Sequence, residues 1–251
     1  MVIARISTNE GIRYAEVKGG RYYLIEGDCF DIKGVSDTPY EGEVKILAPV
    51  EPTKIIALGA NYKKHAEELK LNVNPTPTIF LKPPTAVIAD GDDIVMPRGA
   101  IRVDYEAELA IIIGKDCRFV SAEDYAGVIL GYTCANDVTE RAFQKIDGQW
   151  ARAKGFDTFC PLGKYIVTDI DPFNLELKAI KNGEVVQQGN TSDMIHGIPR
   201  IIEFVSGIMT LKKGDVILTG TPEGIGEIKA GDTIEIEIEK IGSVANKVRN
   251  E

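Results

Sequence analysis

The chain has 251 residues, a hydrophobic fraction of 44% and a formal net charge of −9 at pH 7. A chain of this length can bury a large core and hold one domain, with room for a small second one. The acidic balance and the absence of a basic run argue against nucleic acid and anionic membrane surfaces as partners. No apolar stretch is long enough to cross a bilayer, and the N-terminal residues lack the apolar segment of a signal peptide. The four cysteines are scattered and form no C-x-x-C pair, so we expect free thiols and a cytoplasmic protein.

The first fifty residues have the alternating pattern of short β-strands, which we place at 2–6, 12–17 and 21–27. Glycines at 19 and 20 separate the second strand from the third, as expected of a tight turn. Pro49 and Pro52 close this section. We therefore predict a small N-terminal β domain over 1–52, followed by a second domain over 53–251.

The rest of the chain is again richer in strands than in helices. Asn182-Gly183 lies between two alternating runs, which is a strong hairpin signal. The spacing predicts strands at 54–59, 79–84, 101–113, 130–137, 175–181, 184–189, 214–219 and 232–242. It predicts helices at 61–70, 122–129, 138–145 and 198–209. There is neither a βαβ rhythm nor an internal repeat, so the predicted fold class is mainly β with a few packed helices (α+β).

Two glutamates stand in an otherwise apolar strand, RVDYEAELAIIIG. Side chains alternate along a strand, so Glu106 and Glu108 point the same way, roughly 7 Å apart at Cβ. The following positions are apolar on both faces, which predicts a strand covered on both sides, where bare carboxylates are costly to desolvate. A bound cation would relieve that cost. The alternative is a strand end that faces solvent.

The strand TIEIEIE is a useful comparison, because Glu235, Glu237 and Glu239 also share one face while isoleucines fill the other. That pattern predicts a solvated acidic face, so alternating acids alone are weak support for a metal. A third acid, Asp137, closes the apolar strand VILGYTCAND and strengthens the metal hypothesis. Its alternative role is the N-cap of the helix that follows. Three carboxylates without cysteine or histidine suit a hard cation, Mg²⁺ or Mn²⁺.

Other polar residues have a chemical and an ordinary interpretation. If this segment is a helix, Glu68 lies on the same face as His65 and could make the imidazole a general base. The alternative is a charged surface helix that contains both residues. The loop LTGTPEGIG could bind an anion through backbone amides or form a plain turn. Lys82 and Lys154 could be surface lysines, and we expect His196 to be structural or exposed.

Seven short motifs then follow one another in a fixed order. They are ALGANYKKHAEE, IFLKPPTAVI, VDYEAELAIIIG, GYTCANDVTER, KGFDTFCPLG, GNTSDMI and GDVILTGTPEGIG. Each motif is weak alone, but together they resemble the fumarylacetoacetate hydrolase family from about residue 54 to 248. The resemblance implies a mixed β-sandwich roll for the catalytic part, with residues 1–50 as a small N-terminal β extension.

The resemblance also implies roles for individual side chains. The metal ligands would be Glu106, Glu108 and Asp137. A catalytic dyad on a mobile lid (61–76) would be formed by His65 and Glu68. Lys82 and Lys154 would be two further catalytic residues. Thr158 would lie near the metal together with Lys154. The substrate would be contacted by Arg141, Gln144 and Thr221. The departure from the family pattern is His196, where an aromatic or aliphatic residue is expected.

The substrates implied are small 2-oxo acids with a second carbonyl or carboxylate nearby. We predict a metal-dependent hydrolase that cleaves a C–C bond in acylpyruvate-like 2,4-dioxo acids through a metal-bound enolate, with decarboxylation of oxaloacetate as a second activity. A homodimer is expected by resemblance. One alternative is a 2-hydroxyhepta-2,4-diene-1,7-dioate isomerase or a 5-oxopent-3-ene-1,2,5-tricarboxylate decarboxylase. The alternative of another class is a non-catalytic protein that binds metal or oxo acid.

Overall fold

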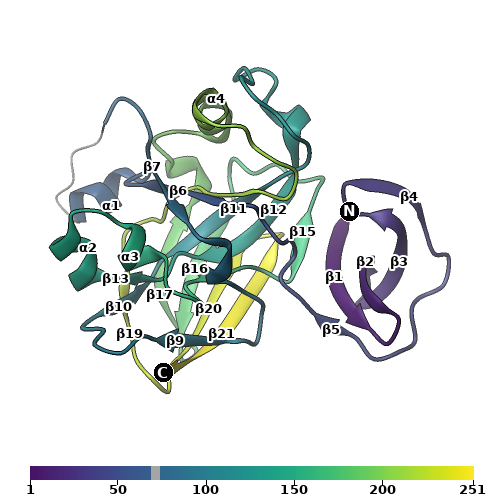
Figure 1. Ribbon diagram of the computed structural model, residues 1–251, viewed down its shortest axis with the longest axis horizontal. Helices are drawn as coiled ribbons and strands as arrows, with labels where there is room; N and C mark the ends of the chain where they lie inside the picture. The colour runs from purple at the N-terminus through teal and green to yellow at the C-terminus, as the bar shows by residue number, and fades with distance from the viewer. Residues whose placement is uncertain (69–73) are drawn as a thin grey trace.

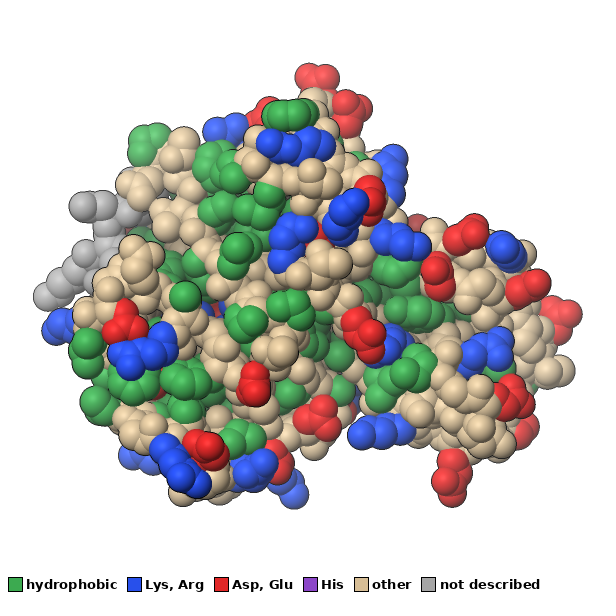
Figure 2. Space-filling model, viewed as in Figure 1, with side chains coloured by type: hydrophobic (Ala, Val, Ile, Leu, Met, Phe, Trp, Pro, Cys, Tyr) green, Lys and Arg blue, Asp and Glu red, His purple; other side chains and the backbone are tan. Residues whose placement is uncertain are grey.

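The computed structural model describes residues 1–68 and 74–251. Across these residues strands far outnumber helices, as Figure 1 shows. The predicted class, mainly β with a few helices, is therefore confirmed. On the face seen in Figure 2, acidic and basic side chains are interspersed rather than gathered by sign. No helix in the described ranges is long and apolar enough to cross a membrane.

The N-terminal residues form an antiparallel meander, set apart at the right of Figure 1. Its strands are β1 (Val2–Thr8), β2 (Gly11–Lys18), β3 (Arg21–Asp28) and β4 (Asp31–Val35), and the short β5 (Lys45–Ile46) pairs with β1. Residues 19 and 20 make the turn between β2 and β3 with positive φ angles of 57° and 76°, which glycine adopts readily. Ile3 and Ile25 pack in one cluster with Ile55, so this meander shares a core with the residues that follow. The division at residue 52 remains a prediction.

The meander continues into the largest sheet, because β1 pairs with β15 (Tyr165–Val167). Beyond β15 the order is β12 (Ile129–Asn136), β11 (Ala107–Ile113), β18 (Val216–Leu218), β6 (Ile55–Gly59) and β7 (Thr78–Lys82). Every residue of β11 is buried. A strand in this central position, covered on both faces, is what its β-branched apolar run predicts.

A second, five-stranded sheet packs against β11 and β12 to form a sandwich. Its order is β17 (Glu184–Asn190), β16 (Glu176–Lys181), β20 (Thr233–Ile238), β21 (Gly242–Asn250) and β9 (Asp93–Met96). Side chains of Leu109 and Ile111 meet those of Leu177 and Ile236 in one core cluster. The predicted hairpin is present as β16 and β17. The isoleucines of β20 are buried while Glu237 is exposed, so the acidic face of this strand is solvated as predicted.

The remaining elements are short and surround the sandwich. Two small sheets consist of β13 (Thr139–Glu140), β10 (Val103–Tyr105) and β19 (Gly226–Ile228), and of β14 (Cys160–Pro161) with β8 (Val87–Ile88). The α-helices in the described ranges are α1 (Lys63–Glu68), α2 (Arg141–Asp147), α3 (Ala151–Lys154) and α4 (Ile198–Ile208). The 3-10 turns are η1 (Pro84–Ala86), η2 (Tyr125–Val128) and η3 (Thr191–Asp193). Figure 1 places α1, α2 and α3 together at the end of the molecule opposite the meander.

Two helix predictions need correction. The helix predicted over 138–145 begins only at Arg141, because Thr139 and Glu140 pair with β10. Glu140 is its N-cap and accepts a hydrogen bond from the Phe143 amide, so Asp137 is not the cap. The helix predicted over 122–129 is only the 3-10 turn η2. Within the helix and lid predicted around His65, residues 69–73 lie outside the described residues.

Candidate active site

Three buried carboxylates meet where β11 and β12 run side by side. Glu106 lies in the one-residue break between β10 and β11, Glu108 lies within β11, and Asp137 follows β12 directly. The antiparallel register pairs Ala107 with Asn136, which brings both glutamates beside the end of β12. The Asp137 amide donates to the Glu106 carbonyl at 3.0 Å. Oxygens of all three carboxylates lie within 4.8 Å of one another.

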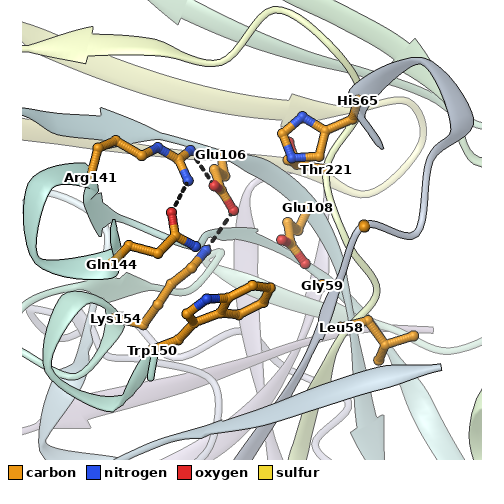
Figure 3. Close-up of a pocket in the computed structure, with 11 residues that line it drawn as sticks. Leu58, Gly59, His65, Glu106, Glu108, Arg141, Gln144, Trp150, Lys154 and Thr221 are labelled. Carbon is orange, nitrogen blue, oxygen red and sulfur yellow. Dashed lines mark hydrogen bonds and ion pairs between the residues drawn. The ribbon is translucent and has the colours of Figure 1, made fainter. Parts of the chain in front are cut away.

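Cationic side chains hold two of these carboxylates. Lys82, at the end of β7, donates to Asp137 Oδ1 at 2.6 Å. Lys154, at the end of α3, donates to Asp137 Oδ2 at 2.5 Å and to Glu106 Oε2 at 2.7 Å. Arg141 contacts the other oxygen of Glu106 (Figure 3). Both lysines are almost fully buried, so the alternative of ordinary surface lysines is wrong.

Glu108 has a different environment. Its Oε2 accepts a hydrogen bond from the Gly220 amide at 2.6 Å. Its Oε1 is buried and has no hydrogen-bond partner, and no salt bridge in the described ranges reaches this carboxylate. Burial, together with the negative charges of Asp137 and Glu106, raises the pKa of Glu108 well above its usual value. A buried acceptor without a donor, beside two more carboxylates, fits the all-oxygen coordination that Mg²⁺ or Mn²⁺ prefers.

The neighbouring ionisable groups favour their charged forms. Burial works to raise the pKa of Glu106, but Lys154 and Arg141 outweigh it, and the pKa of Glu106 lies below its usual value. Burial likewise works to lower the pKa of Lys154, but Asp137 and Glu106 hold that pKa above its usual value. The site is thus a compact cluster of paired charges, in which Glu108 is the carboxylate that lacks a cation.

A histidine of α1 faces this cluster and pairs with a glutamate of the same helix. The His65 ring is nearly buried, and its Nδ1 lies 3.2 Å from Glu68 Oε2. The Gly224 amide donates to Glu68 Oε1 at 3.2 Å, which ties this carboxylate to the glycine-rich loop. With Nδ1 engaged by the carboxylate, Nε2 is the ring nitrogen left to exchange a proton with a guest. Figure 3 shows the ring beside Thr221 and directed toward the two glutamates.

The three predicted substrate contacts, Arg141, Gln144 and Thr221, all line the same pocket. Arg141 donates to Gln144 Oε1 at 3.0 Å. Gln187 Nε2 donates to Thr221 Oγ1 at 2.8 Å, so the Thr221 hydroxyl proton is free to point into the pocket. Two of the other residues named from the sequence lie elsewhere. His196 does not line the pocket, and Thr158 accepts a hydrogen bond from the Val95 amide beside a separate surface groove.

The sequence analysis missed residues that support or line the pocket. Gln187 fastens two parts of the site, because its Oε1 accepts from the Ala107 amide while its Nε2 reaches Thr221. Asn61, fully buried, donates to the carbonyls of Thr219 and His196 beside the root of α1. Trp150 lines the pocket directly. Asn61 stands in the quoted motif NYKKH, and Trp150 is the single tryptophan, so both offered a signal.

Replacing Lys82 with methionine tests the charge balance of the cluster. In metal-free protein we expect Lys82→Met to lower the free energy of unfolding by about 3–5 kcal/mol, because it leaves a buried carboxylate without one of its cations. Added Mg²⁺ should recover part of this loss, since it restores positive charge beside Asp137. Urea unfolding with and without Mg²⁺ measures both effects.

The control for this experiment is Lys229→Met, which removes a surface lysine 3.2 Å from Glu227. It should change stability by less than about 1 kcal/mol in either condition. Equal losses for Lys82→Met with and without Mg²⁺ would contradict a cation next to Asp137.

The sandwich and its buried acidic pocket define a class of protein that sequence comparison identifies. Residues 54–249 match the family described as fumarylacetoacetate (FAA) hydrolase C-terminal. The chain therefore belongs to the fumarylacetoacetate hydrolase family, a family of enzymes, as its motifs predicted.

Known proteins resemble the chain over most of its length. The structure of 5-carboxymethyl-2-hydroxymuconate delta-isomerase from Mycobacterium smegmatis is 45% identical, with a TM-score of 0.90, and the match covers 100% of this chain and 99% of that one. The 2,4-didehydro-3-deoxy-L-rhamnonate hydrolase of Sphingomonas sp. is 40% identical, over 83% of this chain and 78% of the relative. The mitochondrial oxaloacetate tautomerase of Rattus norvegicus is 40% identical, over 82% and 70%. These relatives differ in reaction type, so they define the family but not one reaction.

Proposed function

We propose that this protein is a divalent-metal-dependent hydrolase of acylpyruvate-like 2,4-dioxo acids, with decarboxylation of oxaloacetate as a second activity. The observation that carries the proposal is a cluster of three buried carboxylates, two of which line a pocket together with His65, whose ring lies 3.2 Å from Glu68. The carboxylates Glu106, Glu108 and Asp137 would hold Mg²⁺ or Mn²⁺. The bound cation would act as a Lewis acid for the negative charge that develops on the substrate's oxo group.

His65 would provide the general base of the reaction. Glu68 would accept a hydrogen bond from Nδ1–H and orient the ring, so that Nε2 can take a proton from water. The hydroxyl group of that water adds to the distal acyl carbon, and the bond from this carbon to C3 breaks. C3 then takes up a proton, and the products are a carboxylic acid and pyruvate.

The remaining side chains would bind and orient the acid. Thr221 accepts from Gln187 and can therefore donate its own proton to the substrate carboxylate. Arg141 and Gln144 line the same pocket and offer further donors. Lys154 contacts two of the carboxylates and would balance the added negative charge, with Lys82 behind it. Such fixed donors are in place before reaction, which is the main requirement for electrostatic stabilisation.

The proposal is tested by mixing purified protein and Mg²⁺ or Mn²⁺ with acetylpyruvate. We expect the enol absorbance to disappear while acetate and pyruvate form in equal amounts. The two products are measured by NMR. Oxaloacetate offered in the same way should release CO₂. An unchanged spectrum with every 2,4-dioxo acid tried would refute the hydrolase.

Replacing His65 with glutamine separates chemistry from metal binding. We expect His65→Gln to lower kcat for acylpyruvate cleavage by about 10²–10⁴-fold, the usual contribution of a general base. The Mg²⁺-dependent rise in melting temperature should persist, because His65 is not among the proposed ligands. A variant that keeps near wild-type kcat would rule out this histidine as the base. Loss of the Mg²⁺ effect would instead place it at the metal.

The alternative is an isomerase or decarboxylase of unsaturated seven-carbon diacids, supported by the structural likeness to a delta-isomerase. The same His65–Glu68 pair would then move a proton along the diene without activating water. A dienoate whose absorbance shifts without loss of carbon would favour this reaction. A protein that binds oxo acid and metal but turns over none of these compounds would be the non-catalytic alternative.

The setting of the proposed enzyme follows from the family resemblance. We propose a homodimer in the cytoplasm, with a small N-terminal domain over 1–52 and the catalytic domain over 53–251. Light scattering after size-exclusion chromatography should give about twice the 27.4 kDa mass of one chain. A monomeric mass would contradict the dimer.

A further inference from the structure

The candidate pocket is too small for the proposed substrate in the conformation described. Its volume is about 20 Å³, which is room for one or two water-sized guests, since a single water needs about 10–15 Å³. A 2,4-dioxo acid consists of a three-carbon pyruvate head and an acyl group that contains the second carbonyl. The whole molecule needs several times that space. A bound substrate must therefore extend through the mouth of the pocket or displace part of its lining.

The walls of the pocket differ in chemistry and in anchoring. Glu106, Glu108, Arg141, Lys154 and Thr221 form the polar side. Each of them makes at least one hydrogen bond or ion pair described above, either with another of these residues or with Gly220 or Gln187. The apolar side consists of Leu58, Gly59, Ala60 and Trp150. In Figure 3, Trp150 and Leu58 lie on the lower side of the pocket, away from His65 and Thr221. An oxo-acid head held on the polar side would direct its acyl tail toward the apolar side.

Trp150 provides most of the bulk on that apolar side. It lies between α2 and α3, two helices of seven and four residues. Its indole packs edge-on against Phe80, with ring centroids 5.1 Å apart. It also rests on Gly59, where an added Cβ would lie only 2.4 Å from Trp150 Cζ3. The absence of a side chain at residue 59 is therefore what allows the indole to occupy this position.

We propose that Trp150 is the specificity-determining residue of the pocket, and that its indole restricts the substrate's acyl group to short, unbranched chains. This inference rests on the proposed function for the identity of the substrate head. Leu58 lies on a buried strand within the sandwich, whereas Trp150 lies in a short connection between helices. The indole is accordingly the part of the apolar wall that sets how much room is left for the tail.

The test measures how the length of the tail affects wild type and Trp150→Ala. The substrates are acetylpyruvate and 2,4-dioxo acids with longer, branched or phenyl tails. We expect Trp150→Ala to raise the ratio of kcat/KM for the bulky acids over acetylpyruvate by at least tenfold, with Trp150→Phe in between. Ile146→Ala, at an exposed position of α2, is the control and should leave the ratio unchanged. A parallel fall for all substrates would overturn the proposal.

A binding series keeps the inference testable if no C–C cleavage is found. Thermal shifts with Mg²⁺ are compared for oxalate, pyruvate and 2-oxo acids with longer tails. Wild type should bind the short acids best, and Trp150→Ala should lose this preference. An unchanged order of affinities would overturn the role of Trp150 whatever the reaction is, whereas normal selectivity without cleavage would refute only the hydrolase. If wild type binds none of the acids, both the proposed hydrolase and the role of Trp150 would be refuted.

The single tryptophan gives an independent readout. Titrating the Mg²⁺-loaded protein with oxalate should change the emission of Trp150, because the indole lines the filled pocket. Gly59→Ala should shift the emission without any ligand, since its methyl group displaces the ring. Emission unchanged at an oxalate concentration that saturates the thermal shift would overturn the placement of the indole against the substrate.

Discussion

Glu108→Gln should abolish the response of this protein to Mg²⁺. Wild type in Mg²⁺ at 100 times its dissociation constant should gain about 2.7 kcal/mol of stability, and the variant should gain close to none. The amide keeps the shape of the side chain and an oxygen for the Gly220 amide, but it cannot supply the charge of the carboxylate. Activity should fall by at least about 10³-fold, because Lewis-acid stabilisation is worth several kcal/mol.

The metal-free variant distinguishes a ligand from a structural carboxylate. Because Glu108 lies beside two other buried acids and no cation contacts it within the described ranges, its neutralisation should leave the metal-free protein as stable as wild type or more so. Calorimetry of both proteins with and without Mg²⁺ measures this. Glu237→Gln, at an exposed position of β20, is the matched control and should leave the Mg²⁺ response intact. A retained Mg²⁺ response in Glu108→Gln would remove the proposed ligand set.

Alternation and turn chemistry were enough to predict most of the longer strands, although β9 and the nine-residue β21 were not among them. The hairpin around Asn182-Gly183 and the helix at Ile198–Ile208 have strong local signals, a two-residue turn and an amphipathic run, and both are present. The failed helices are short ones, where neighbours decide. Thr139 and Glu140 have the local pattern of a helix start, but strand pairing with β10 delays the helix to Arg141. Such pairing depends on residues more than thirty positions away, and a local pattern does not contain it.

The candidate site shows the same limit. Glu106 and Glu108 stood out because two acids in a strand covered on both faces are unusual. The contact of Lys82 with Asp137 joins the end of β7 to the residue after β12, which are separated in the sheet by β11, β18 and β6, and the sequence alone left Lys82 as a possible surface residue. Gln187 holds Thr221 from a hairpin, and Trp150 lines the pocket from a helix connection, and neither segment carries a chemical motif. Their positions follow from the tertiary structure.

Asp215 is a second residue whose loss we expect to destabilise the fold strongly, although it lies outside the pocket. Its carboxylate is fully buried and accepts from the Thr53 hydroxyl at 2.7 Å, the Thr53 and Lys54 amides at 3.2 Å each, and the Lys212 amide at 2.7 Å. Lys54 Nζ supplies the counter-charge. This one side chain therefore joins the start of β6 to the turn before β18, its parallel neighbour in the central sheet.

Asp215→Ala should lower the free energy of unfolding by about 3–5 kcal/mol, because it leaves a half-buried lysine and several backbone donors without their acceptor. Urea unfolding followed by circular dichroism measures the loss. The control is Asp116→Ala, which removes a half-exposed carboxylate 2.6 Å from Lys212 and should cost far less, because exposed ion pairs contribute little to stability. Similar losses for the two variants would contradict the central role that we assign to the buried contacts of Asp215. If Asp215→Ala is too unstable to purify, Asp215→Asn can replace it, because the amide keeps one acceptor oxygen. We expect an intermediate loss of stability for this variant. The charge that faces Lys54 is gone, but part of the hydrogen bonding to residues 53 and 54 remains.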